Sequence, residues 1–172
     1  AAVNTAKVEP GAVCVVFGAG GVGLNTIQGC AMSGAAMVIA VDMNDAKLTL
    51  AKDFGATHVL NPSGGDDVVK TLRRLTGGGA DYAFECVGFG SILAQAYGCL
   101  RKGGTAVMVG VGRSDDQTTV RTNTLMFEEK TLTGSLYGGA RPRVDFPRLL
   151  GLYKAGQLKL DALVTRRYSI DE

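Results

Sequence analysis

The sequence predicts an α/β protein with a doubly wound parallel sheet, on the strength of three observations. Short apolar runs of strand length alternate with helical patterns through most of the 172 residues, as in βα units. The runs are apolar throughout, which is typical of strands buried on both faces. The 25 glycines are about twice the usual share of roughly 7% and fall in short clusters, which indicates loops that depend on glycine.

The first part of the chain is predicted to alternate strand and helix. Apolar runs predict strands over residues 13–17, 37–41 and 57–60. The first helix begins near residue 21 and ends at Gly34, which suits a left-handed C-terminal cap. Asn44 can N-cap the second helix and Gly55 can close it. The third strand stops at Asn61-Pro62.

The same rhythm continues in the second part. A helical stripe over residues 68–75 has acids just before it and Gly77-Gly78-Gly79 after it. A strand over 82–86 precedes a helix over 92–100, which the cations and glycines of residues 101–104 would end. The remaining expectations are a strand at 105–109, irregular chain at 112–129, a strand at 130–136 and a helix from near Asp145 to Gly156.

Composition excludes several other classes of protein. Hydrophobic residues make up 46% and charged residues 20% of the chain, which is the balance of a globular protein. The net charge is only +2, and without a basic run nothing favours nucleic acid as a partner. Residues 10–41 carry no charge, but glycines and polar residues interrupt them, so we expect no membrane partner. No signal peptide is visible, and we expect a cytoplasmic protein.

The two ends suggest a piece of a longer protein. The chain begins Ala1-Ala2-Val3 without an initiator Met. It ends at Ser169-Ile170-Asp171-Glu172, which has the form of a capping box at the start of a helix. We therefore expect residues 1–172 to be a single domain excised from a two-domain protein, with a disordered tail as the alternative.

The cysteines and the single histidine do not predict a zinc site. Cys14, Cys30, Cys86 and Cys99 form no C-x-x-C pair, and only His58 could join them. Each cysteine lies in an apolar stretch, which favours reduced core thiols in a cytosolic protein. His58 is interpreted as structural.

A G-x-G-x-x-G fingerprint follows the first predicted strand, at Gly18-Ala19-Gly20-Gly21-Val22-Gly23. A position between a buried strand and a helix is the context of a dinucleotide-binding turn. Gly18 would permit the tight turn, Gly20 would let the backbone approach a pyrophosphate, and Gly23 would let the helix pack closely on the sheet. The N-terminus of the helix would face the phosphates. The competing interpretation is simple turn chemistry.

Asp42 completes this fingerprint at the end of the second predicted strand. An acid there can accept hydrogen bonds from both ribose hydroxyls of an adenosine and repels a 2′-phosphate, and no Arg follows it, so the pattern favours NAD over NADP. A solvated acid at a strand end is the competing interpretation. S-adenosylmethionine methyltransferases use a similar turn and acid and stay an alternative. Short-chain dehydrogenases are excluded because no tyrosine is followed by lysine four residues later.

Taken in order, the motifs resemble the coenzyme-binding domain of zinc-dependent medium-chain alcohol dehydrogenases. The resemblance covers nearly the whole chain, and two motifs, Asp42-Met43-Asn44 and Phe84-Glu85-Cys86, favour the alcohol and formaldehyde dehydrogenase branch. It implies a Rossmann fold of six parallel strands in the order 3-2-1-4-5-6. The segments that carry it are residues 3–10, 18–23, 41–47, 84–88, 109–111 and 134–139.

The resemblance also implies a set of cofactor-binding residues. The backbone of Gly20, Gly21 and Val22 would hold the pyrophosphate, with Val22 also behind the nicotinamide. Asp42 and Lys47 would hold the adenosine ribose, and Met43, Cys86 and Val87 would line the adenine slot. Val109, Val111 and Tyr137 would anchor the nicotinamide end. The competing interpretations are a solvated helix residue for Lys47, a local role for Tyr137, and core membership for the cysteine and valines after strands four and five.

The function implied by the resemblance is hydride transfer between NAD and a small alcohol or aldehyde bound to zinc. In that family the zinc ligands and the proton relay belong to another domain, and neither the ligands nor the relay is expected among these residues. We therefore expect this chain to bind NAD(H) but to be inactive alone, with no catalytic residue or metal ligand of its own. A homodimer through residues 130–136 is also implied. A stand-alone dinucleotide-binding or redox-sensing module is the alternative from a different class.

Overall fold

The computed structural model describes residues 1–170. It contains two compact units, Ala1–Gly139 and the chain from Ala140 onward. Every candidate cofactor residue belongs to the first unit. The prediction of a single domain over the whole chain stays a prediction.

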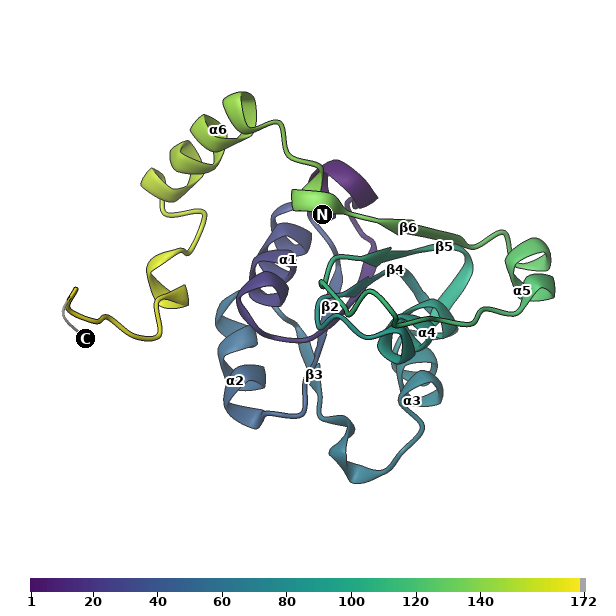
Figure 1. Cartoon of the computed structure of the whole chain (residues 1–172). Coiled ribbons are helices and arrows are strands. Elements are labelled where there is room, and N and C mark those ends of the chain that lie inside the picture. The colour runs from purple at the N-terminus through teal and green to yellow at the C-terminus, as the bar shows by residue number, and fades with distance from the viewer. Residues whose placement is uncertain (171–172) are drawn as a thin grey trace. The chain divides into compact units, whose positions relative to one another are not determined.

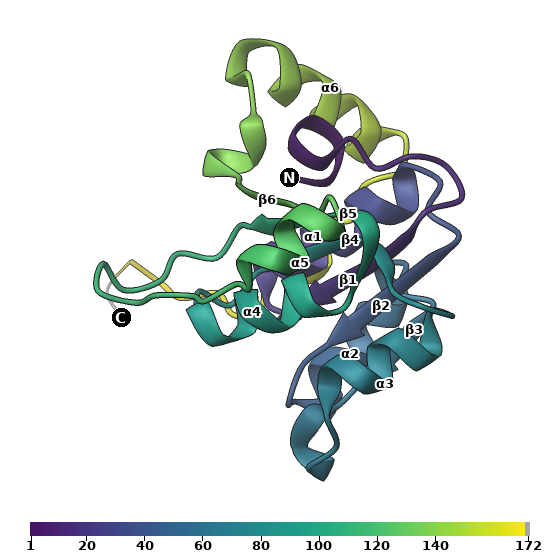
Figure 2. The same cartoon turned by 90° about the vertical axis from the view of Figure 1, so that its right-hand side faces the viewer.

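The first unit is built on a six-stranded parallel sheet in the order β3-β2-β1-β4-β5-β6. The predicted fold class and strand order are confirmed. Figure 2 shows β3 and β6 at opposite edges of the sheet. The strands are β1 (Val13–Phe17), β2 (Met37–Val41), β3 (His58–Leu60), β4 (Ala80–Glu85), β5 (Leu100–Met108) and β6 (Thr131–Gly134).

Helices cover the sheet on both sides. The pair α1 (Gly21–Met32) and α2 (Asp45–Asp53) lies on one side, and the pair α3 (Val68–Leu75) and α4 (Gly90–Gly98) lies on the other (Figure 1). Shorter pieces are α5 (Thr122–Phe127) and the single turns η1 (Ala2–Ala6), η2 (Pro62–Gly64) and η3 (Leu136–Gly139).

The core forms where both helical layers meet the central strands. Val15, Val16, Ile39 and Phe84 are fully buried, because β1, β2 and β4 each have neighbours on both sides and helices on both faces. Burial of such a side chain contributes about 1.5–3 kcal/mol. This packing holds the carboxyl ends of the strands in fixed positions beside one another.

Several predicted helix ends, those at Asn44, Gly34 and the start of α3, are confirmed by hydrogen bonds or by backbone conformation. The Asn44 side chain accepts from the backbone N–H groups of Ala46 and Lys47, at 2.9 and 3.2 Å. Gly34 follows α1 with φ +82°, the left-handed conformation that glycine adopts without strain. Asp67 caps α3 through the Lys70 N–H at 3.1 Å.

The expected end of the helix before β5 is wrong. Residues 101–104 belong to β5, which begins at Leu100 and pairs there with Ala80. A register irregularity between Ala80 and Tyr82 admits the extra residues. Cations and glycines end helices, but here they lie at the solvent-facing start of a strand, where Arg101 pairs with Asp81.

Three further boundaries differ from expectation. The segment predicted to be irregular contains α5, whose N-cap Arg121 gives no capping signal. The last predicted strand is shorter, because Leu136 lies in η3 instead of β6. In the second unit, α6 (Pro142–Lys154) begins at Pro142, before the expected Asp145, since proline suits the first helical turn.

The second unit consists of α6 and the turn η4 (Asp161–Leu163). Asp145 is buried and accepts the Arg141 N–H at 2.7 Å. The Tyr153 hydroxyl donates to Asp161 at 2.8 Å. The predicted capping box at the C-terminus involves residues 171–172, which lie outside the described residues. Within residues 1–170 no helix is long and apolar enough to cross a bilayer.

Candidate dinucleotide-binding site

The glycine turn between β1 and α1 contains two glycines that the fold itself needs. Gly18 is buried at φ +90° and donates its N–H to the Val41 carbonyl at 2.7 Å. A Cβ at Gly23 would overlap the carbonyl oxygen of Gly18. These positions match the tight-turn and close-packing roles predicted for them.

The other two glycines of the turn are different, because a Cβ built at Gly20 or Gly21 would meet no described atom within 4 Å beyond the adjacent residues and the backbone of the helix itself. Gly20 is the N-cap of α1 at φ −78°, and none of the described side chains caps the helix. The first turn also contains no acid, so its backbone N–H groups and the positive helix end face open space. A helix N-terminus of this kind attracts anions, and a side chain at Gly20 would enter the open space beside it.

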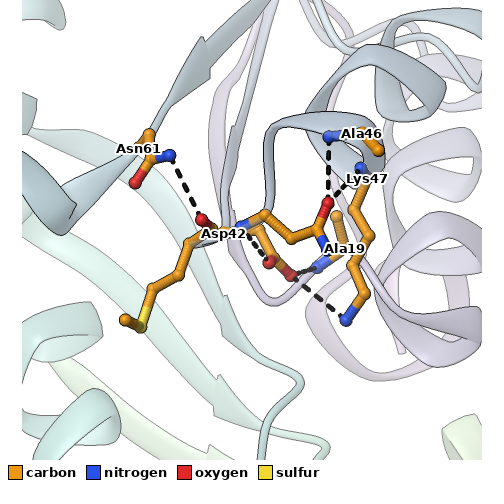
Figure 3. A network of polar contacts seen from close by, with 7 residues as sticks. Ala19, Asp42, Ala46, Lys47 and Asn61 are labelled. Carbon is orange, nitrogen blue, oxygen red and sulfur yellow. Dashed lines mark hydrogen bonds and ion pairs between the residues drawn. The ribbon is translucent and has the colours of Figure 1, made fainter.

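Asp42 follows β2 and joins the glycine turn to the next loop (Figure 3). Its Oδ2 accepts the Ala19 N–H at 2.8 Å and its Oδ1 accepts the Asn44 N–H at 2.9 Å. Lys47 Nζ lies 4.0 Å from Oδ2. A carboxylate has about four acceptor positions, so two backbone donors orient it and leave capacity for two hydroxyl groups.

Asn61 supports the loop after β2 and was missed as a site residue. Its Nδ2 donates to the Met43 carbonyl at 3.2 Å (Figure 3) and also to Asp45 Oδ1 at 2.7 Å. Its Oδ1 accepts the Ser63 N–H at 3.0 Å. The sequence signal was available, because Asn61 follows a strand that is parallel to β2, and the ends of parallel neighbours lie side by side.

The loops after β4 and β5 form the other part of the candidate site. Val87 is 46% exposed and Val111 is 94% exposed, so the core interpretation is wrong for these two valines. Val109 and Cys86 are half-buried. Val87 also reaches the glycine turn, since its Cγ2 lies 2.8 Å from the Cβ position of Gly18.

Glu85, the last residue of β4, is a fully buried acid that was not assigned a role. Its Oε1 accepts the N–H groups of Val87 and Gly88 at 2.9 and 2.8 Å. The sequence signal was weak, because an acid at the end of an apolar strand is also typical of a solvated strand end.

The remaining candidate side chains are exposed at the same carboxyl edge. Met43 is 73% exposed after β2, and Lys47 lies in the first turn of α2. Val22 is 52% exposed on the first turn of α1. Tyr137 follows β6 in η3 at φ +52°, and Gly138 beside it accepts a hydrogen bond from the Ala1 amino group at 3.2 Å.

The cysteines are free thiols without a reactive environment. Burial raises the pKa of Cys86 to about 12, and the hydrogen bond between its sulfur and Thr26 Oγ1, 3.6 Å apart, opposes this shift only in part. Burial likewise raises the pKa of Cys99 to about 12. A hydrogen bond with Cys14 is the main cause that raises the pKa of Cys30, and burial is the second. Thiolates are the ligands of zinc and the reactive species in redox sensing, so the raised pKa values of Cys30, Cys86 and Cys99 disfavour both roles for these three residues.

The arrangement defines a class of protein. Strand order reverses at β1, whose neighbours β2 and β4 continue in opposite directions, and ligands bind at the carboxyl ends beside such a switch point. With the glycine turn and the acid after β2, this is a dinucleotide-binding domain of the Rossmann type. Comparison with known proteins gives the family: the chain belongs to the zinc-binding dehydrogenases, which it matches over residues 21–155.

Individual relatives agree with this family. An S-(hydroxymethyl)glutathione dehydrogenase of Paracoccus denitrificans is 39% identical over 179 residues, covering all of this chain and 48% of that protein. The crystal structure of benzyl alcohol dehydrogenase from Acinetobacter calcoaceticus is 36% identical, with a TM-score of 0.90 over 95% of this chain and 45% of that one. The chain spans about half the length of the curated relatives it matches.

A third relative bears on the cofactor. A zinc-binding dehydrogenase from Sinorhizobium meliloti 1021, solved bound to NADP, is 27% identical, with a TM-score of 0.85 over 96% of this chain and 48% of that one. The chain therefore corresponds to the coenzyme-binding region of a zinc-type medium-chain alcohol dehydrogenase.

Proposed function

We propose that this chain binds NAD(H) and holds its nicotinamide for hydride transfer in a zinc-type alcohol dehydrogenase. One observation carries the proposal: the uncapped N-terminus of α1 faces open space at Gly20 and Gly21, beside the oriented carboxylate of Asp42. A helix N-terminus next to a strand-end acid provides what a diphosphate and a ribose need. NAD, when bound, supplies the hydride acceptor.

Each part of the site would hold one part of the cofactor. The N–H groups at Gly20, Gly21 and Val22 would bind the pyrophosphate. Asp42 would accept hydrogen bonds from the adenosine ribose hydroxyls, and Lys47 would donate to the same sugar.

The base and the nicotinamide would lie on the two sides of this centre. Met43 would line the adenine slot together with Cys86 and Val87. The strand-end groups of Val109 and Val111, with Tyr137, would hold the nicotinamide end, and Val22 would lie behind the ring. We take these roles from the family pattern that the residues match.

We further propose that NAD is preferred to NADP. The Asp42 side chain is only 13% exposed and lies where a ribose would be held, so a 2′-phosphate would meet a fixed negative charge. The residues after it are Met43 and Asn44, and neither is a cation. Lys47 is the nearby cation, but it already lies beside Asp42 and partly neutralises it.

Zinc and substrate would belong to other residues of the whole dehydrogenase. Within residues 1–170 no group of three His, Cys, Asp or Glu side chains could hold a metal ion, and the raised pKa values of Cys86 and Cys99 keep these two thiols protonated. The residues present therefore do not fit a catalytic zinc. We propose that a small alcohol or aldehyde binds outside this chain, that β6 pairs across a two-fold axis in a homodimer, and that the enzyme is cytoplasmic.

The experiment that tests the proposal is calorimetric titration of the chain with NAD, NADP and S-adenosylmethionine. We expect NAD to bind most tightly, S-adenosylmethionine not to bind, and zinc to be absent from protein purified without chelators. We expect no NADH formation with a panel of primary alcohols. Binding of S-adenosylmethionine in place of NAD, or equal affinity for NAD and NADP, would contradict the assignment. Stoichiometric zinc with steady turnover would show that the chain has its own catalytic site.

A further inference from the structure

We propose that Glu85 is a positioning residue for the cofactor, because it fixes the two loops after β4 and β5 that form one side of the proposed site. The inference rests on the proposed binding of NAD(H). Glu85 is fully buried, so it has no surface that could touch the cofactor itself. It would act through the loops that it holds.

The side chain of Glu85 holds the loop after its own strand. Its Oε1 accepts the N–H groups of Val87, Gly88 and Phe89, at 2.9, 2.8 and 3.4 Å. Three donors converging on one carboxylate oxygen determine the path of the chain between β4 and α4. Charge-assisted hydrogen bonds of this kind are about twice as strong as neutral ones. The conformation that exposes Val87 is therefore maintained by a buried carboxylate.

The main chain of the same residue holds the loop after β5. The Glu85 carbonyl accepts the N–H groups of Val109 and Gly110, at 2.8 and 2.9 Å. These bonds extend beyond the last paired residues, Glu85 and Met108. One residue thus connects both loops, and the proposed adenine and nicotinamide contacts share a single support.

The two loops interlock through glycines, so a movement of one displaces the other. A Cβ at Gly110 would lie 2.8 Å from Glu85 Oε2, and a Cβ at Gly88 would lie 2.5 Å from the Val111 carbonyl oxygen. Val87 in turn packs against Gly18 in the turn proposed for the pyrophosphate. Displacement of residues 87–89 would therefore disturb every proposed contact on this side of the site.

Fold stability alone gives a poor explanation of this acid. Its Oε2 has no hydrogen-bond partner among the described residues, and a buried oxygen without a partner is costly. An apolar residue at the end of β4 would avoid that cost, as Phe17 and Val41 do at the ends of β1 and β2. An apolar residue there could not accept the hydrogen bonds from the N–H groups of residues 87–89.

The test compares Glu85→Gln with a matched substitution at the other end of β4. Asp81 also holds a neighbouring backbone N–H, that of Val13 at 2.7 Å, but it lies at the amino end of the sheet, away from the proposed site. Asp81→Asn therefore removes a comparable carboxylate from the same strand. Affinities for NAD are measured by calorimetry at a temperature where circular dichroism shows each variant to be folded.

We expect Glu85→Gln to weaken NAD binding by about tenfold, because a neutral acceptor holds the three donors less strongly. Glu85→Asp, which keeps the charge but is shorter, should weaken binding similarly. Asp81→Asn should lower the melting temperature but change the affinity by less than about twofold. Hydrogen exchange at the amides of Val87 and Gly88 should accelerate in the Glu85 variants only.

Each other result has a definite meaning. Unchanged affinity in folded Glu85→Gln would overturn the positioning role. An equal loss in Asp81→Asn would show that general destabilisation causes the effect, and would overturn it too. If the unsubstituted chain does not bind NAD, the proposed function fails and the inference fails with it, which separates this case from the first two.

Discussion

Replacement of Asp42 by serine tests the centre of the proposed site. The carboxylate accepts the N–H groups of Ala19 and Asn44 and is mostly buried. Serine is shorter and neutral, and its hydroxyl can replace one of these acceptors at most. The substitution therefore removes the ribose acceptors and also loosens the contact between the glycine turn and the loop after β2.

The structure sets the size of the expected loss. Two acceptor positions of Asp42 remain for ribose hydroxyls, and a hydrogen bond to a charged group contributes about 1.5–3 kcal/mol. If the serine hydroxyl replaces one of the two, loss of the other raises the Kd for NAD by roughly ten- to 150-fold. NADP should be affected much less, because the repulsion between Asp42 and the 2′-phosphate disappears at the same time.

Calorimetry with both cofactors measures these affinities, and Asp45→Ser is the matched control. The substitution Asp45→Ser removes the same charge at a neighbouring position. The Asp45 side chain accepts a hydrogen bond from Asn61 and has no hydrogen bond to the glycine turn among the described residues. We expect the control to keep its NAD affinity within about twofold. A drop of equal size in both variants, or equal losses for NAD and NADP in Asp42→Ser, would refute the reasoning.

Four further outcomes follow from the geometry. Gly20→Val should give a folded chain that no longer binds NAD, because its side chain enters space that is open in the structure; retained affinity would remove the phosphate site from this turn. Gly23→Ala should instead lower the melting temperature or prevent folding, since its Cβ would overlap Gly18. Asn44→Ala should cost about 1 kcal/mol in urea unfolding, the usual value of an N-cap. The Cys86 thiol, with a pKa of about 12, is ionised in about one molecule in 10^5 at pH 7. Iodoacetamide should therefore label it far more slowly in the native than in the unfolded chain, and faster as the pH rises. Rapid labelling of the native chain at pH 7 would contradict the raised pKa.

Much of the fold could be predicted because its signals are local. Continuous apolar runs at residues 13–17 and 37–41 coincide with β1 and β2, and Asn44 marks the start of α2 by a bond within its own turn. The failures have the same cause. The cations and glycines of residues 101–104 have the local pattern of a helix end, and only pairing with β4 makes them part of a strand.

The candidate site divides along the same line. The glycine turn was identifiable from the sequence because the backbone requires glycine at Gly18 and Gly23. Asp42 was identifiable because the alternation of strands and helices places it at the end of a strand. Asn61 had only the signal of its position after a strand, and Glu85 had a weaker one, because the partners of both lie in loops whose paths depend on packing.

The sequence by itself therefore determined the fold class, the strand order expected for that class and the glycine turn that we propose as the phosphate site. The tertiary structure decided which glycines the fold needs and which leave space, that Val87 and Val111 are exposed, and that a buried acid holds both loops of one side. The physical reason is the separation along the sequence of the residues that interact. Turns, caps and strand burial depend on neighbours a few residues away, whereas the shape of a cleft depends on which distant backbone groups meet when the parallel strands pair.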